Sequence, residues 1–196
     1  MADVQLESDH IILLCTSNCD DNSFYQNTLQ QSQSTTSNTL QDHFDQLPAS
    51  LQQICGHVIL PDDDGIAMDG SLLGVSNGSV KGIKATHAWT LTTDSCDHLA
   101  MKGCGPVDGN TSTLSSFRSE VQGQVALLIM MTLLVRVHNI THSSFTSICD
   151  NQGALKCLQP LETGLWLHHH KEADADLLLT FCQWSDTNIK CTPQWV

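Results

Sequence analysis

The stretch SSFRSEVQGQVALLIMMTLLV, residues 115–135, is the clearest element of the sequence. It begins with a natural helix N-cap, Ser115 or Ser116, and Glu120 follows in the first turns. Gly123 costs about 1 kcal/mol relative to alanine inside a helix, and such a glycine is tolerated where a helix lies close to a sheet. Apolar positions at helical spacing cover most faces of the C-terminal half, which predicts a largely buried helix. These positions are Val121, Val125, Leu128, Ile129, Met131, Thr132 and Val135.

Strand patterns lie on both sides of this helix. Three precede it, and the third leads into a turn predicted at Gly103, Gly105 and Gly109. A strand, two helices and a last strand follow it, and this order predicts an α/β domain with a mixed sheet covered by helices. The predicted strands are 72–76, 86–92, about 98–102, 144–149 and 189–196, and the predicted later helices are 152–158, capped by Asn151, and 171–184.

The chain before residue 72 has a different character. Residues 1–40 are predicted to be a polar, partly disordered N-terminal segment, because Gln26–Asn38 is rich in Gln, Ser and Thr and has no period of 2 or 3.6. Residues 41–71 regain apolar positions and are interpreted as a connector that ends in a turn. The folded domain is therefore expected at residues 72–196.

The charge of the chain restricts its function. The formal charge is −13, from 8 Lys and Arg against 21 Asp and Glu. Nucleic-acid affinity comes largely from cations that replace counterions on phosphates, so the chain is predicted to be a poor independent nucleic-acid binder. Its nine cysteines are irregularly spaced without a CxxC pair, which favours free, mostly buried thiols over a zinc site.

No membrane attachment is expected. The longest apolar run, Val125–Val135, is shorter than the roughly 20 residues that cross a bilayer. The N-terminus carries acidic residues and no basic region of a secretory signal. We therefore expect the chain in the cytoplasm or the nucleus.

Two carboxylates stand where metal chemistry could use them. Glu120 is in the first turns of a buried helix, and Asp150 follows a predicted strand. Hard Mg²⁺ ions take oxygen ligands, and sites in open α/β sheets gather at the carboxyl ends of strands. Each residue also has a structural interpretation, because Glu120 complements the helix dipole and Asp150 caps a turn.

Four groups of short segments resemble, in the same order, the ribonuclease H domains of retrotransposon polyproteins. The resemblance covers about the last 125 residues, counted from residue 72. The segments are VSNGSVK with THAW (75–81 and 86–89), SSFRSE (115–120), ICDNQGAL (148–155), and DADLL with QWV (174–178 and 194–196).

The resemblance implies a five-stranded mixed sheet flanked by helices, and Mg²⁺-dependent hydrolysis of the RNA strand of an RNA–DNA hybrid. Four acidic residues hold two metal ions in that family. Glu120 and Asp150 match the second and the third, and Asn77 stands where the first aspartate is expected. Ser79 and Asn151, which lie in the same motifs, are the candidate substrate-binding residues.

The fourth acidic residue and the last helix of that family have no counterpart before Val196, so we expect a domain that is truncated at its C-terminus. Two alternatives stay open for the missing ligands. Asp69, in Asp69-Gly70-Ser71, could be the true first-strand residue, although the spacing to Trp89 favours Asn77. Asp174 or Asp176 could replace the fourth ligand, although we expect both on a solvated helix surface.

These departures affect the expected activity. Asparagine is nearly isosteric with aspartate but neutral, and its amide nitrogen cannot ligate a cation, so Mg²⁺ binding is expected to be weak. The prediction is a ribonuclease H-like domain that is catalytically silent and binds a hybrid weakly. The alternative is a non-catalytic interaction module whose acidic surface meets a basic protein partner.

Overall fold

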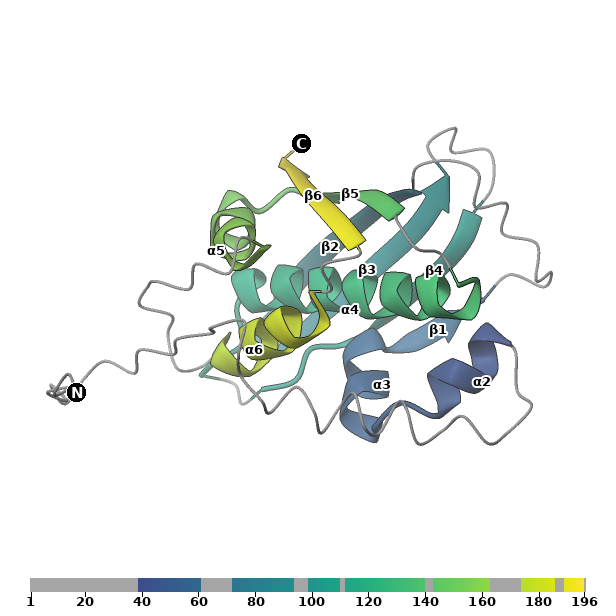
Figure 1. Cartoon of the computed structure of the whole chain (residues 1–196). Helices are drawn as coiled ribbons and strands as arrows, with labels where there is room; N and C mark the ends of the chain where they lie inside the picture. Colours follow the sequence, from purple (N-terminus) through teal and green to yellow (C-terminus); the bar gives the residue numbers. More distant parts are fainter. Residues whose placement is uncertain are drawn as a thin grey trace, which may run out of the picture.

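The structure is a computed structural model of the chain, and it describes residues 39–60, 72–93, 99–109, 112–139, 143–162, 174–185 and 189–195. Within these residues a six-stranded mixed sheet packs against helices (Figure 1). Residues 1–38 of the predicted N-terminal segment 1–40 and the alternative ligand Asp69 lie outside the described residues.

The sheet has the strand order β1-β4-β3-β2-β5-β6. The first four strands in this order are antiparallel neighbours, whereas β2, β5 and β6 run parallel. The strands are β1 (His57–Ile59), β2 (Leu72–Lys81), β3 (Lys84–Thr93), β4 (Leu99–Pro106), β5 (Ser143–Cys149) and β6 (Ile189–Trp195). The predicted mixed α/β sheet of five strands is therefore confirmed, and β1 adds a sixth strand at one edge.

The predicted central helix is α4, Ser116–Val137, and it is buried along most of its length. It is long and apolar enough to cross a membrane, but 89% of its most apolar stretch is buried inside the protein. It is therefore the core helix of this fold. A Cβ on Gly123 would lie 2.9 Å from the Cβ of Ser76 on β2, which confirms that this glycine lets the helix approach the sheet.

The segment predicted as a connector contributes to the same folded unit. It forms α2 (Leu40–Asp45) and α3 (Ala49–Cys55), and the edge strand β1 follows at once. Leu51 and Ile54 are buried in the main core, and the Trp89 Nε1–H donates a hydrogen bond to the Cys55 carbonyl at 2.9 Å. Described residues of the predicted connector thus pack into the same core as the strands and helices from residue 72 onward.

Two further boundaries differ from the prediction. Gly103 and Gly105, expected in a turn, lie inside β4 and pair with Trp89 and His87 of β3. In the sequence, the two glycines interrupt the strand pattern and indicate a turn. In the structure, β4 continues through them because it pairs with β1 on one side and β3 on the other. The later helices are α5 (Gln152–Glu162) and α6 (Ala175–Trp184), and α6 starts four residues after the predicted Lys171.

The described cysteines with placed side chains are free thiols. Cys55 and Cys149 are buried, Cys157 and Cys182 are half-buried, and Cys104 is exposed. The expectation of free thiols therefore agrees with these five, although only two of them are fully buried.

Candidate functional site

Glu120 is positioned by the start of α4. The Ser115 side chain caps the helix by accepting a hydrogen bond from the Arg118 N–H at 3.0 Å. Glu120 is only 3% exposed, and its Oε1 accepts a hydrogen bond from the backbone N–H of Gly78 on β2 at 2.5 Å. A Cβ on Gly78 would lie 2.5 Å from the Cβ of Ser119, so only glycine allows this close approach.

Asp150 follows the last residue of β5 and is exposed. One oxygen of Glu120, the Sγ of Cys149 and one oxygen of Asp150 lie within 4.8 Å of one another. The buried Cys149 thiol donates toward Glu120 Oε2 at 3.5 Å. The structure therefore brings the two candidate carboxylates together and adds a thiol to the same cluster.

The electrostatics of this cluster disfavour negative charge. Burial raises the pKa of Glu120 above its ordinary value, the Gly78 N–H opposes this shift, and the negative charge of Asp150 adds to it. Burial also raises the pKa of Cys149 to about 12, and the two carboxylates contribute in the same direction. A cation at this cluster would relieve the repulsion between its members.

Asn77 lies on β2 beside Gly78, and its side chain is exposed. Val75 of β2 pairs with Ile148 of β5 in the parallel ladder, and Asn77 and Asp150 each follow that pair by two residues. Asn77 therefore lies level with Asp150, which directly follows the neighbouring strand β5.

The two candidate substrate-binding residues have different surroundings. Ser79 is exposed on β2, opposite Thr86 of β3. Asn151 is half-buried, and its Oδ1 accepts a hydrogen bond from the Ala154 N–H at 3.1 Å, so it caps α5 as predicted. Because this oxygen accepts the cap hydrogen bond, the side-chain amide nitrogen of Asn151 is the group that could donate to a ligand.

A polar bridge one turn further along α4 fixes the helix on the two strands that carry the site. The Gln124 Nε2–H donates to Ser76 Oγ at 2.8 Å and to the Ile148 carbonyl at 3.2 Å. The Ser147 hydroxyl donates to Gln124 Oε1. All three side chains are buried, so this bridge holds β2, α4 and β5 in one arrangement next to the cluster.

Arg118 forms an ion-pair group that the sequence analysis did not find. Its guanidinium makes two hydrogen bonds to Asp176, at 2.8 and 2.6 Å, and a longer one to Asp174 at 3.4 Å. Its Nε–H donates to the Asp108 carbonyl at 2.5 Å. Arg118 is 3% exposed, so the group ties α4 to α6 and to the segment after β4.

This group corrects the expectation for the two aspartates. Both aspartates bind Arg118, Asp174 is buried, and only Asp176 lies on a solvated helix surface as expected. Neither belongs to the group of metal-binding atoms found among the described residues. One signal was present in the sequence, because an arginine at the start of a helix that is predicted to be buried needs an acidic partner.

The cluster of Glu120, Cys149 and Asp150 fits one divalent ion better than two. Mg²⁺ is commonly held by one or two carboxylates together with water and substrate phosphates, and Glu120 Oε2 and the Asp150 carboxylate offer that set. A second ion would need a further charged oxygen ligand, whereas Asn77 is neutral and the Cys149 thiol is a soft donor.

Three known structures are similar to this chain. They are the N-terminal ribonuclease H domain of a Mycobacterium tuberculosis protein (11% identity, TM-score 0.42), ribonuclease H1 from the halophilic archaeon Halobacterium salinarum (13%, 0.42) and LC11 ribonuclease H1 in complex with an RNA/DNA hybrid (9%, 0.45). Each similarity covers 64% of this chain and 86% of the other. No family model and no curated protein matches the sequence. The sheet itself, with β4, β3, β2, β5 and β6 in this order against helices, is the five-stranded mixed α/β arrangement that the motifs predict.

Proposed function

We propose that this chain is a ribonuclease H-like domain of a retroelement polyprotein that binds an RNA–DNA hybrid weakly and does not cleave it. The observation that carries the proposal is the meeting of Glu120 and Asp150 beside the ends of two parallel strands, next to a neutral Asn77. The order of the sequence motifs supports the retroelement origin. Such a domain would act in the cytoplasm or the nucleus.

Glu120 and Asp150 are the residues that would hold a Mg²⁺ ion. When bound, such an ion supplies an activated water and stabilises the leaving oxygen of a phosphodiester. The chain's own contribution is orientation, because the Gly78 N–H fixes one oxygen of Glu120 and Gln124 fixes α4 against both strands. The second oxygen of Glu120, toward which the Cys149 thiol donates, and the exposed Asp150 carboxylate are the groups that would meet the ion.

The neutral Asn77 is the reason for the proposed loss of cleavage. Two-metal hydrolysis clamps both the attacking and the leaving oxygen, and each ion needs anionic ligands. With Asn77 in place of an aspartate, Glu120 and Asp150 supply two formal negative charges for up to four positive ones. Occupancy by two ions is therefore disfavoured, and the chemistry that depends on the pair is lost.

A cleavage assay tests this proposal. The full chain is incubated with a labelled RNA–DNA hybrid in Mg²⁺ and, separately, in Mn²⁺, and we expect intact RNA in both. Glu120→Ala serves as the site variant, and Asp45→Ala, which removes an exposed acidic residue of α2, is the matched control.

Two results would contradict the proposal. Robust cleavage that Glu120→Ala abolishes and Asp45→Ala preserves would show an active enzyme. A chain that binds neither a divalent ion in calorimetry nor the hybrid would instead favour the non-catalytic module that meets a protein partner.

A further inference from the structure

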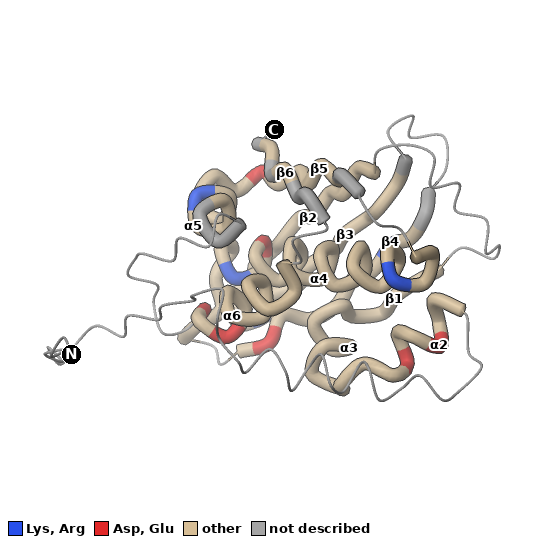
Figure 2. The backbone as a smooth tube through the Cα atoms, in the orientation of Figure 1, with Lys and Arg blue, Asp and Glu red and all other residues tan. Residues whose placement is uncertain are grey.

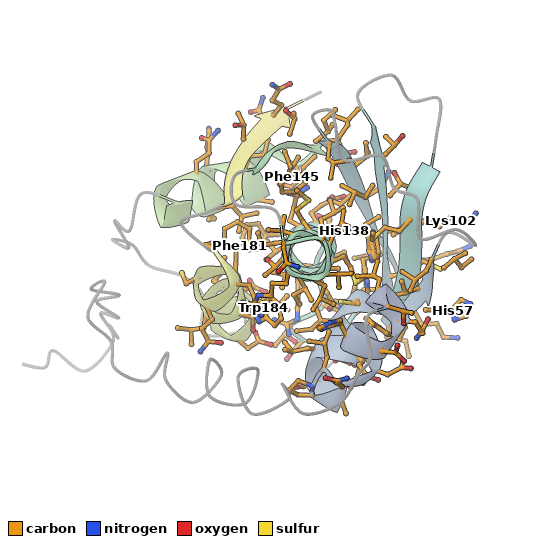
Figure 3. All side chains as sticks on the ribbon, turned by 45° about the vertical axis from the view of Figure 1, so that its right-hand side comes forward. His57, Lys102, His138, Phe145, Phe181 and Trp184 are labelled. Atoms are coloured by element: carbon orange, nitrogen blue, oxygen red, sulfur yellow. The ribbon has the colours of Figure 1, made fainter. Side chains whose placement is uncertain are left out.

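The outer face of strands β2, β3 and β4 is exposed and carries polar side chains beside the apolar Val75 and Ala88. Their inward side chains, such as Leu72, Trp89 and Met101, are buried toward α4, and the alternate side chains point the other way. Figure 3 shows Lys102 of β4 and His57 of β1 pointing away from α4, on the side opposite the helices. We call its exposed polar residues Asn77, Ser79, Lys81, Lys84, Thr86 and Lys102 the lysine face.

The lysine face has a charge opposite to that of the whole chain. The six strands contain Lys81, Lys84, Lys102 and Lys190, which are half of the eight Lys and Arg residues, and they contain no Asp or Glu. The described acidic residues all lie in helices or connections (Figure 2). In a chain of net charge −13, the strand residues of this face thus carry no negative charge.

Two of these lysines face each other at the tip of a hairpin. Lys81 and Lys84 are directly opposite in the β2–β3 ladder, and both are exposed. Like charges in this position destabilise a strand pair. Neither lysine, nor Lys102, forms an ion pair with another residue in the part of the chain that the structure describes. An anion held between Lys81 and Lys84 would turn this repulsion into attraction.

We propose that the lysine face binds the phosphate backbone of the hybrid, leading from the candidate site to the β2–β3 hairpin. This inference rests on the proposed function for the identity of the ligand. From Asn77 to Lys81 the strand extends about 13 Å at a rise near 3.3 Å per residue. A duplex strand presents about four phosphates over that length.

The side chains favour phosphate over an acidic protein. Lysine, serine, threonine and asparagine are the usual donors to phosphate oxygens, and all four types are present in this set. Protein interfaces are depleted in lysine and have aromatic residues at their centre. The described outer positions of β2, β3 and β4 carry no aromatic side chain.

The salt dependence of binding tests the proposal. Binding of the full chain to a short fluorescein-labelled hybrid is followed by anisotropy at several salt concentrations, with EDTA present so that no divalent ion contributes. The double variant Lys81→Gln/Lys84→Gln removes the hairpin charges. Lys156→Gln, an exposed lysine of α5 outside the lysine face, is the matched control for one lost charge.

Each phosphate contact contributes about 0.9 to the slope of log K against log salt. We therefore expect the double variant to lower the slope by about 2, and to weaken binding on the order of ten- to a hundredfold at about 0.1 M salt. Lys156→Gln should leave the slope unchanged. Circular dichroism of the variants confirms that they are folded.

The outcomes separate this inference from the proposed function. If the hybrid binds and the double variant keeps the wild-type slope, the lysine face is not the phosphate site, while the proposed function survives. If Lys156→Gln lowers the slope as much per charge, the attraction is unspecific and the inference fails. If a polyglutamate peptide binds the wild type and the hybrid does not, the lysine face recognises an acidic protein, and both proposals are overturned.

Discussion

Arg118 and Glu120 lie two residues apart at the start of α4, and each is 3% exposed. Their surroundings are opposite in kind. The Arg118 guanidinium meets two aspartates and a carbonyl oxygen, so its positive charge is balanced within the fold. Glu120 meets one backbone N–H, a thiol and a second carboxylate, so negative charge accumulates there.

The difference separates a structural site from a functional one. A buried charge normally acquires an opposite charge or a metal ion. The Arg118 group meets this need with the chain's own residues, and it joins α4 to α6. The groups that shift the pKa of Glu120 include no cation. A buried carboxylate with a shift of this kind is typical of a site that binds a cation.

The largest effect is expected from removing the balanced charge. Arg118→Ala leaves the buried Asp174 without its guanidinium, so the free energy of unfolding should fall by about 3 kcal/mol. Urea denaturation measures this change. Arg136→Ala, which removes an exposed arginine from the same helix and its contact with Trp184, should cost less than about 1 kcal/mol. Equal losses in the two variants would show that the Arg118 group is not a structural anchor.

Supplying the missing carboxylate should turn the Glu120 cluster into a stronger cation site. Asn77→Asp is expected to raise the affinity for Mn²⁺, so that Mn²⁺ stabilises this variant more than the wild type. A concentration ten times the dissociation constant corresponds to about 1.4 kcal/mol of stabilisation. Thermal unfolding with and without Mn²⁺ measures it, and Asn77→Ser is the neutral control. If Mn²⁺ shifted the unfolding temperature equally in all three proteins, position 77 would not belong to the cation site.

Neutralising Glu120 should stabilise the fold when no cation is present. Glu120→Gln keeps an oxygen that can accept the Gly78 N–H and removes the repulsion with Asp150, so in EDTA the free energy of unfolding should rise by about 1 kcal/mol. The sign is opposite to that of Arg118→Ala. Asp45→Asn, an exposed acidic residue of α2, should change stability by less than about 0.5 kcal/mol. A destabilised Glu120→Gln would mean that the carboxylate has a structural partner.

The elements with a strong period were predictable from the sequence, and long-range pairings were not. The buried stripe of α4, its cap at Ser115 and the alternation of β2 and β3 follow from local spacing. The edge strand β1 has three residues, which is too short for a period, and only the ladder with β4 defines it. Arg118 and Asp176 are 58 positions apart, so no local pattern joins them.

The candidate site was predictable to a similar extent. Strand ends and motif order indicated Glu120 and Asp150, because both follow from local structure. Cys149 was missed as a third member, although the alternation of β5 turns it inward, toward the same helix as Ser147. Whether Cys149 lies near Glu120 depends on how closely α4 approaches β2, and packing sets that distance.

The smallest effect is expected from pH, and it again has opposite signs in the two regions. Burial alone would raise the pKa of Asp176, but its hydrogen bonds and ion pair with Arg118 outweigh burial and lower it below 3.8. The stability that this pair contributes is therefore complete above about pH 4 and is lost as the pH falls through the lowered pKa. Glu120, whose pKa is raised above 4.5, contributes stability below that value and loses it as the pH rises through the raised pKa.

Urea denaturation between about pH 6 and pH 3 distinguishes the two contributions. Asp176→Asn should flatten the acid-side loss by less than about 1 kcal/mol, because the Asp176 side chain is 61% exposed and solvent screens the pair. Glu120→Gln should not change this loss of stability at low pH. It should remove the decrease in the free energy of unfolding that occurs as the pH rises above about 4.5. If both variants changed the same limb of the curve, the two charges would titrate as one group, and the contrast between a balanced and an unbalanced start of α4 would not hold.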